Sequence, residues 1–233
     1  MGVSSSKKKK ENNKKIIDVK QNKYSNNTAC GEFIGELKNG KKEGKGIAYY
    51  NNGDRYEGEF KNNLRDGYGI YFYGNEKCKD DVYIGYWKEG KFEGKGIYYY
   101  NRPEFKGDIY DGEYKNHQKH GNGIYYYNRN KYKNDIFIGK YKEDKRDGKG
   151  IYYFNDGKTY DGNWTLDIIN GKGIYYYKNG DIYEGDFINA KKEGDGIYYY
   201  NNGDKEIGKY LKDKKIGKHT LIKVDGSINY INY

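Results

Sequence analysis

The sequence predicts an all-β protein in which consecutive β-hairpins form one elongated, single-layer antiparallel meander. Two observations predict this fold. Glycine recurs in a fixed pattern along most of the 233 residues, and short runs with large residues at every second position alternate with polar segments. No stretch shows a sustained helical period of 3.6 residues, so we expect no helix. Residues 1–25 are rich in lysine and are predicted to be a disordered basic tail.

The glycine pattern defines eight units. In each unit a first glycine is followed nine residues later by a second, and this spacing never changes. The pairs are Gly35 and Gly44, Gly58 and Gly67, Gly85 and Gly94, Gly112 and Gly121, Gly139 and Gly148, Gly162 and Gly171, Gly185 and Gly194, and Gly208 and Gly217. Seven units add a third glycine two residues later, as in Gly94-Lys95-Gly96. Such self-similarity indicates a repeat array.

Large residues flank the glycines at fixed distances. An aromatic residue stands two positions before most first glycines, and another large residue stands two positions after, as Tyr83 and Trp87 do around Gly85. The third glycine is followed by isoleucine and usually by a tyrosine run such as Tyr98–Tyr100. This alternation predicts two short strands per unit, because Tyr, Phe and Ile suit a pleated, half-buried surface.

The segments between these strands are predicted to turn. The stretch between the first two glycines of a unit, such as Lys61–Asp66, is polar. Neighbouring units join through Asn52-Gly53, Asp156-Gly157, Asn179-Gly180 and Asn202-Gly203. Asn-Gly and Asp-Gly predict two-residue turns here, because both residues of such a pair can adopt positive φ.

Three adjacent units are longer than the others. The first glycines are spaced 23, 27, 27, 27, 23, 23 and 23 residues apart, and the extra residues fall within Gly74–Asp81, Asn101–Asp108 and Asn128–Asp135. An even insertion is expected to lengthen both arms of a hairpin without flipping its faces. Three hairpins should therefore project along one edge, and we expect protein partners to bind either to these hairpins or to a groove lined by the repeated aromatic residues. The candidate residues on the hairpins are Glu76, Lys77, Arg102, Pro103, Phe105, Arg129 and Tyr132.

The combination Tyr-x-Gly-x-Tyr/Phe, then Gly-x-Gly-Ile-Tyr, at a 23-residue period resembles the MORN repeat family. The resemblance covers residues 32–218 as eight repeats, and it implies a twisted sheet with a shallow groove lined by aromatic residues and glycines. The eighth repeat departs from the pattern, with Glu206 and His219 in place of the leading aromatic residue and the third glycine. Residues 219–233 are interpreted as a capping hairpin. The abundance of Asn, Lys, Tyr and Ile further resembles apicomplexan, malaria-parasite MORN-repeat proteins.

The composition fits a thin sheet better than a thick globular core. Mean hydropathy is −1.26 and only 34% of residues are hydrophobic. The 32 tyrosines supply apolar area with a polar tip, and 16 strands would extend roughly 75 Å. The chain shows neither a transmembrane run nor a secretory signal. Cys30 and Cys78 are expected to be free thiols, and His117 and His120 to flank a solvated turn, so we expect no metal and no cofactor.

The beginning of the chain, Met1–Ser6, matches the pattern for N-myristoylation, in which Gly2 would carry the acyl chain. A myristoyl group alone binds bilayers weakly, with an association constant of about 10⁴ M⁻¹. A second signal follows in a run of basic side chains, each adding about 1 kcal/mol against an anionic leaflet. These lysines are Lys7, Lys8, Lys9, Lys10, Lys14 and Lys15. Phosphorylation of Ser4, Ser5 or Ser6 is expected to weaken this attraction.

The positive charge lies at the two ends of the chain. Residues 1–23 carry a net charge of +6 and residues 205–223 of +5, whereas residues 24–204 hold 29 basic and 29 acidic residues. The neutral body argues against nucleic-acid binding, which needs a basic groove. A headgroup site outside the tail is plausible only in the basic eighth repeat. Its candidate residues are Lys209, Lys212, Lys214 and Lys215.

These features predict a non-catalytic scaffold tethered to the cytoplasmic face of the plasma membrane or of an internal membrane system. Its partners would be the anionic inner leaflet and proteins that the sequence does not identify. Two alternatives remain open: direct binding of anionic phospholipids such as phosphoinositides by the repeats, and a role as regulatory subunit of a separate enzyme. We expect no enzymatic activity, since neither a P-loop nor a nucleophile elbow is present. Exposed edge strands at either end suggest a homodimer.

Overall fold

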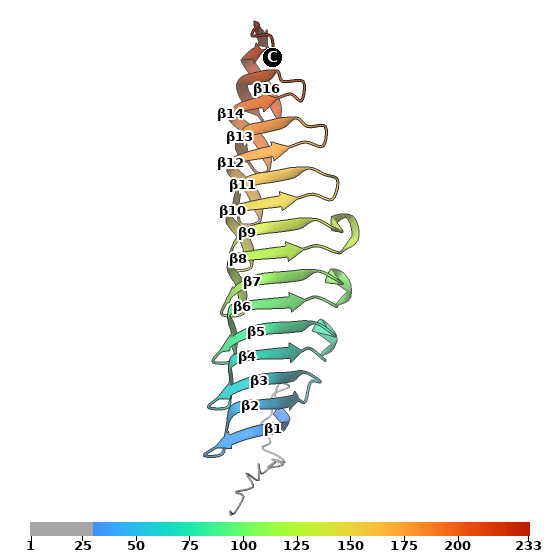
Figure 1. Cartoon of the computed structure of the whole chain (residues 1–233), viewed down its shortest axis with the longest axis vertical. Helices are drawn as coiled ribbons and strands as arrows, with labels where there is room; N and C mark the ends of the chain where they lie inside the picture. The colour runs from blue at the N-terminus through green and yellow to red at the C-terminus, as the bar shows by residue number, and fades with distance from the viewer. Residues whose placement is uncertain (1–29) are drawn as a thin grey trace, which may run out of the picture.

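The computed structural model describes residues 30–233, which form a single antiparallel sheet of 17 strands (Figure 1). Each strand pairs with the strands before and after it in the sequence, so the sheet is a meander of consecutive hairpins. The predicted fold class is confirmed for these residues. The predicted tail, residues 1–25, lies outside the described part of the chain.

Sixteen of the strands are seven, nine or ten residues long and form eight consecutive hairpins, and the last strand, β17, has five residues. The strands are β1 Cys30–Lys38, β2 Lys41–Tyr50, β3 Arg55–Lys61, β4 Leu64–Phe72, β5 Val82–Lys88, β6 Lys91–Tyr99, β7 Ile109–Lys115, β8 Gln118–Tyr126, β9 Ile136–Lys142, β10 Lys145–Tyr153, β11 Thr159–Thr165, β12 Ile168–Tyr176, β13 Ile182–Ile188, β14 Lys191–Tyr199, β15 Lys205–Leu211, β16 Lys214–Ile222 and β17 Ile228–Asn232.

The register aligns the first and third glycines of the repeats in a row across the sheet. Gly85 of β5 pairs with Gly69 of β4 on one side and with Gly96 of β6 on the other. Just beyond each such pair within a hairpin the register shifts, as between Gly85 and Trp87. The row of glycines and the adjacent β-bulges together mark a line along which the strands can bend.

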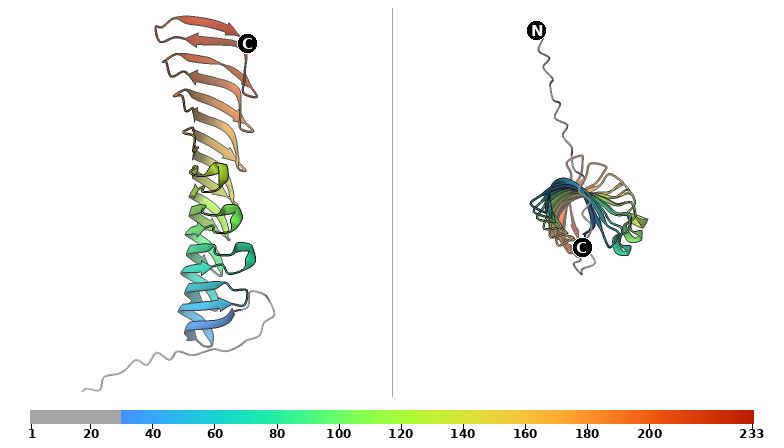
Figure 2. Two further views of the ribbon diagram at one scale, coloured as in Figure 1. Left: turned by 90° about the vertical axis from the view of Figure 1, so that its right-hand side faces the viewer. Right: turned by 90° about the horizontal axis from the view of Figure 1, so that it is seen from below.

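The strands bend toward the face that carries the aromatic residues. The ring centroids of Tyr83 and Trp87, four residues apart on β5, lie 5.3 Å from each other, whereas four residues of a straight strand span about 13 Å. A Cβ atom on Gly85 would lie 2.6 Å from Cα of Gly96 and 2.6 Å from the Tyr83 hydroxyl. Glycine is therefore required at the bend, and the sheet forms a long gutter, seen along its axis in Figure 2.

The concave face is filled by a continuous ladder of edge-to-face aromatic contacts. Each leading aromatic residue contacts the second aromatic residue of its own repeat and of the next one. Tyr110, for example, lies 5.2 Å from Tyr114 and 5.1 Å from Tyr141 between ring centroids. Tyr83, Tyr110 and Phe137 are fully buried. A single-layer sheet can therefore hold a core, because bending encloses one of its faces.

The two ends of the hairpins turn differently from the prediction. Two-residue turns connect the two strands within a repeat. Asn62 and Asn63 in one such turn have φ of 48° and 71°, and Leu166 and Asp167 in another have 49° and 71°. The Asn-Gly segments form longer links instead. Between β2 and β3 the amide of Gly53, with φ of 87°, donates to the carbonyl of Tyr50 at 3.0 Å. The expectation of two-residue turns at the Asn-Gly and Asp-Gly sites was wrong.

The three insertions do not lengthen the hairpin arms, which corrects a second expectation. Strands β5, β7 and β9 have seven residues each, like β11. The extra residues form short 3₁₀ turns that lie side by side along one edge of the gutter (Figures 1 and 2). These turns are η1 Glu76–Cys78, η2 Pro103–Phe105 and η3 Asn130–Tyr132. We call this row of three turns the flange.

The eighth repeat keeps the hairpin, but the ring that fills its bend comes from a different position in the repeat. Elsewhere the leading aromatic ring covers both glycines, as Tyr183 covers Gly185 and Gly196. In the eighth repeat the ring belongs to His219, which occupies the space above Gly208, and Nδ1 of His219 lies 2.9 Å from Oε1 of Glu206. The two departures seen in the sequence therefore compensate each other. Strand β17 then pairs with β16.

Candidate functional site

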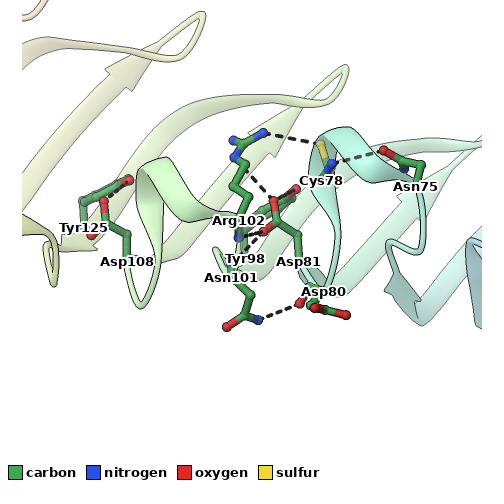
Figure 3. Close-up of polar contacts among 9 residues, drawn as sticks. All are labelled: Asn75, Cys78, Asp80, Asp81, Tyr98, Asn101, Arg102, Asp108 and Tyr125. Atoms are coloured by element: carbon green, nitrogen blue, oxygen red, sulfur yellow. Dashed lines mark hydrogen bonds and ion pairs between the residues drawn. The ribbon is translucent and has the colours of Figure 1, made fainter.

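A row of buried aspartates joins neighbouring repeats along the edge that carries the long links. Asp81 accepts hydrogen bonds from the Tyr98 hydroxyl at 2.9 Å, from the Asn101 amide at 2.7 Å and from the Arg102 amide at 3.0 Å (Figure 3). The same arrangement recurs throughout most of the array. Its aspartates are Asp54, Asp81, Asp108, Asp135 and Asp181. These carboxylates satisfy backbone amides that would otherwise be unpaired in the long links.

Lys158 interrupts the aspartate row. It occupies the position of Asp135 and Asp181 in the neighbouring links, and its ammonium pairs with Asp156 at 2.7 Å. Tyr175, which stands where Tyr152 and Tyr198 stand in adjacent repeats, makes no hydrogen bond to a carboxylate within residues 30–233. The junction between the fifth and sixth repeats therefore lacks the carboxylate–tyrosine hydrogen bond that the other junctions between complete repeats have.

The flange brings together several residues that the sequence analysis proposed for partner binding. Phe105 lies between two guanidinium groups, 4.8 Å from that of Arg102 and 4.3 Å from that of Arg129. Nε of Arg129 lies 3.2 Å from the buried carboxylate of Asp108, and Arg102 also donates to Sγ of Cys78 at 3.4 Å. Cation–π contacts and ion pairs thus fix these long side chains in place.

The remaining proposed flange residues are distributed along the row. Pro103 opens η2, and Glu76 and Lys77 are exposed on η1. The ring of Tyr132 on η3 lies 6.1 Å from that of Tyr127, and it is 40% exposed. The flange therefore presents a mixed aromatic and charged edge, and its Phe105 ring lines a pocket on the concave side.

A pocket of about 300 Å³ lies between the flange and the opposite wall of the gutter. We call it the central pocket. Its lining residues are Phe105, Lys119, Tyr125, Tyr127, Arg129, Tyr141, Asp144, Arg146 and Asp167. They come from η2, from strands β8, β9 and β10, from the link before η3 and from two tight turns, so that the pocket spans three repeats. Most of these residues were not identified from the sequence.

Lys119 is the central cation of this pocket. Its ammonium lies 5.0 to 5.6 Å from the ring centroids of Tyr110, Tyr125 and Tyr141. Among residues 30–233 it makes neither a salt bridge nor a side-chain hydrogen bond. Burial lowers the pKa of Lys119, and the carboxylate of Asp144 opposes that shift. Lys119 thus holds a positive charge that the rings stabilise but no anion neutralises directly.

Of the four candidate lysines in the basic eighth repeat, one forms an ion pair and three are exposed. Nζ of Lys215 lies 2.6 Å from Oε2 of Glu206 and 3.0 Å from the Tyr200 hydroxyl, so it belongs to the packing of this end. Burial raises the pKa of the Glu206 carboxyl, but donors on Lys215 and Tyr200 outweigh it and lower the pKa below its usual value. The other candidate lysines are exposed: Lys209, Lys212 and Lys214.

The residues proposed for membrane attachment lie outside the part of the chain that the structure describes. They are Gly2, Ser4, Ser5, Ser6, Lys7, Lys8, Lys9, Lys10, Lys14 and Lys15. Within residues 30–233, no helix is long and apolar enough to span a membrane.

Comparison with known families agrees with the repeat geometry. The profile of the MORN repeat matches seven segments: residues 33–55, 56–77, 83–102, 110–130, 137–159, 160–182 and 183–205. The chain belongs to the MORN repeat family. The match ends before the eighth hairpin, in which Glu206 and His219 replace the usual residues. This MORN protein therefore has seven repeats that fit the family pattern and an eighth hairpin that retains only the architecture.

Solved structures give only distant matches to this MORN protein. The TCP domain of Drosophila melanogaster SAS-4, in complex with a proline-rich motif of Ana2, is 16% identical at a TM-score of 0.37; the match covers 82% of this chain and 85% of that one. A mutant TCP10 domain of Danio rerio CPAP is 12% identical at a TM-score of 0.43, covering 86% and 95%. Neither similarity bears on function. Curated protein sequences give no significant match.

Proposed function

We propose that this MORN protein is a non-catalytic scaffold, tethered to the cytoplasmic face of a membrane, that presents its repeat array to protein partners. The observation that carries the proposal is the continuity of the rod. The aromatic residues of the concave face bury one another, so the core takes up one face, while the flange and the outer face stay exposed along the array. Extended repeat surfaces of this kind suit protein binding.

The outer face offers a regular surface for such partners. Cross-strand neighbours there form a row that is mostly isoleucine and lies half exposed, with acidic residues inserted at intervals. Its middle portion runs through Ile70, Ile84, Ile97, Asp111, Ile124, Ile138 and Ile151. Ile138, for example, is 40% exposed. Partly exposed apolar rows bordered by charges are typical of protein-binding surfaces.

The proposed tether combines the acyl chain on Gly2 with the lysines that follow it. One myristoyl chain gives only marginal attachment, and stable anchoring requires a second signal such as a polybasic segment. The proposal takes Met1 as the initiating residue. The composition further leads us to propose an apicomplexan origin.

The tether is tested by imaging a C-terminal fluorescent fusion in the cells from which the protein comes. We expect the parent to mark a membrane and the Gly2→Ala variant to become diffuse, because the acyl chain can no longer attach. Equal membrane marking by both would show that acylation is not the anchor. Partner presentation is tested by proximity labelling: a fusion carrying only residues 1–29 should mark the same membrane and lose the proteins labelled by the full chain.

A negative charge placed beside the lysines should weaken the tether. Each phosphate contributes a charge of about −1.5 to −2 at neutral pH, and glutamate imitates part of it. We expect the triple variant of Ser4, Ser5 and Ser6 to glutamate to partition less into vesicles of phosphatidylcholine and phosphatidylserine, measured by sedimentation of the myristoylated protein. A triple change to asparagine is the uncharged control. Unchanged partitioning of the glutamate variant would rule out an electrostatic switch.

Direct phospholipid binding by the repeats is the second candidate function. The exposed side chains of Lys209, Lys212 and Lys214 support it, whereas the ion pair of Lys215 with Glu206 removes one of the four candidate lysines. Vesicle binding by a chain that lacks residues 1–25, lost when the three exposed lysines become glutamine, would favour this function over the tether. Regulation of a separate enzyme remains a further alternative, and proximity labelling would identify such a partner.

A further inference from the structure

We propose that the central pocket binds an aspartate or glutamate carboxylate on an extended acidic segment of a protein partner. This inference rests on the proposed scaffold function, since it names the chemistry of one partner contact. The pocket lies where the flange faces the cations of the concave wall. Its proposed ligand follows from its unmatched charge, its rigid donors and its carboxylate rim.

The unmatched charge is that of Lys119. Arg129 and Arg146, which also line the pocket, already have carboxylate partners: Nε of Arg129 lies 3.2 Å from Asp108, and Nε of Arg146 lies 3.1 Å from Asp167. Lys119 has only aromatic rings around its ammonium among the described residues. Asp144 accepts a hydrogen bond from the Lys119 backbone amide at 2.9 Å, but it makes no salt bridge with the Lys119 ammonium within residues 30–233. A single anionic group entering the pocket would therefore give Lys119 the ion pair that the other two cations already have.

The donors of the pocket are held in position before any ligand arrives. Arg146 also donates to the carbonyl oxygen of Asp167 at 2.8 Å, and its guanidinium lies 4.2 Å from the ring of Trp164. Tyr141 lines the same pocket, is only 4% exposed, and has a buried hydroxyl without a hydrogen-bond partner in residues 30–233. Preorganised donors reduce the entropy lost on binding, and an unpaired buried hydroxyl gains by acquiring an acceptor.

The charges at the rim favour a carboxylate over a phosphate. Asp144 and Asp167 line the pocket together with the three cations, and Asp108 neutralises Arg129 from behind. The three cations and these three carboxylates balance, so a ligand anion gains chiefly the contact with the Lys119 ammonium. A phosphate, which carries about −1.5 to −2 at neutral pH, would be repelled by the two rim carboxylates. A carboxylate with a single negative charge meets less of this repulsion.

The array contains a matched control for this site. Lys192 stands at the position equivalent to Lys119, and its ammonium lies 5.0 to 5.5 Å from the rings of Tyr177, Tyr183, Tyr198 and Tyr210. The hydroxyl of Tyr210 is likewise buried without a partner in the described chain. No insertion faces Lys192, because its repeat has the short link. Loss of either lysine should disturb the aromatic packing equally, but only Lys119 should affect the ligand.

The experiment measures fluorescence polarisation of a labelled decamer of glutamate against the full chain, beside a glutamine decamer of equal length. We expect the glutamate peptide to bind at least about tenfold more tightly, and Lys119→Met to abolish that advantage, as charge-assisted contacts allow. The Lys192→Met variant should retain it. Inorganic phosphate, and vesicles of phosphatidylcholine with phosphatidylserine, should compete poorly.

Equal binding of both peptides would overturn the proposal, as would equal loss in both lysine variants, which would indicate a purely structural effect. Strong competition by phosphate would overturn the choice of carboxylate, and strong competition by vesicles would assign the pocket to lipid. The scaffold proposal fails separately: it depends on the localisation of the Gly2→Ala variant and on proximity labelling, and neither measurement requires the central pocket.

Discussion

At the scale of single residues, the glycines at the bend have a different role from those in the turns. Gly85 lies against the backbone of Gly96 and the ring of Tyr83, so its requirement is for space. Gly90 has a φ of 82° in a two-residue turn, but a Cβ there would meet no atom within 4 Å. Glycine is favoured at this position because of the positive φ, and Asn63 adopts a similar φ of 71° in the preceding turn.

Gly85→Ala should therefore be strongly destabilising. The added methyl group forces Gly96 and Tyr83 apart in a closely packed bend, at a cost of about 3 kcal/mol in the free energy of unfolding. Gly90→Asn is the control and should change stability by less than about 0.5 kcal/mol. Urea denaturation followed by circular dichroism measures both. A small effect at Gly85 would mean that the sheet bends elsewhere.

The junction at Lys158 can be repaired with residues that the array already uses. Three other links contain Asn-Gly-Asp, and the aspartate binds the next tyrosine in two of them: Asp54 binds Tyr71 and Asp181 binds Tyr198. The double change Asp156→Asn and Lys158→Asp should give the Tyr175 hydroxyl a carboxylate acceptor. One added hydrogen bond in a chain of this size should raise the thermal midpoint by about 2–4 °C. An unchanged or lower midpoint would show that Tyr175 gains nothing from an acceptor.

At the scale of elements, the strands were predictable and the turns only partly so. Alternation of large residues fixes which side chains share a face, and the nine-residue glycine spacing fixes the hairpin. The position of the two-residue turns was missed, because Asn-Gly also suits longer links with one residue of positive φ. Residue type did not reveal the turn at Leu166 and Asp167. There the Asp167 amide donates to the carbonyl of Arg146, in the preceding repeat, at 3.0 Å.

The middle turn of the flange, η2, is expected to be dispensable for folding. Replacing residues 101–107 with Asn-Asn-Gly would reproduce the link found at 201–203, and Asp108 would still accept from Tyr125. We expect the free energy of unfolding to fall by less than about 1 kcal/mol, since only partly exposed contacts of Arg102 and Phe105 are lost. Glutamate-peptide binding should decline in the same variant. Unfolding of the variant would instead assign the flange a structural role.

The central pocket could not have been predicted, because its residues are contiguous only after the strands bend. Phe105, Lys119 and Asp167 are separated by 14 and 48 residues in the sequence. A signal was nevertheless present. A basic residue stands two positions before the second glycine in six of the eight repeats. The six residues are Lys42, Arg65, Lys119, Arg146, Lys192 and Lys215.

At the scale of the whole molecule, stability depends on a large number of buried phenols. Burial raises the pKa of Tyr73 to about 12, and it raises the pKa of Tyr114 and Tyr141 well above the ordinary value. In the unfolded chain tyrosine ionises near pH 10. Each unit by which the pKa in the folded state exceeds that value corresponds to about 1.4 kcal/mol for each tyrosine. The folded state binds these protons more tightly, so its stability is complete below about pH 10 and falls as the pH rises further.

The protein should therefore unfold steeply in alkali. We expect tyrosinate absorbance and loss of the β-sheet circular dichroism signal to appear together in one transition above about pH 10. The sum of many small contributions makes this transition sharp. A gradual titration of most tyrosines near pH 10 with the sheet signal intact would show that the phenols are accessible in the folded state.

The aromatic ladder also allows the length of the rod to change by whole repeats. Each leading ring contacts only its own repeat and the next, as Tyr160 contacts Trp164 and Phe187. Removing residues 160–182 would place Tyr183 after Thr159 and create no new kind of contact. The rod would shorten by two strands, or about 10 Å. Gain or loss of whole repeats in the gene would thus change the distance between the two ends of the rod, one repeat at a time.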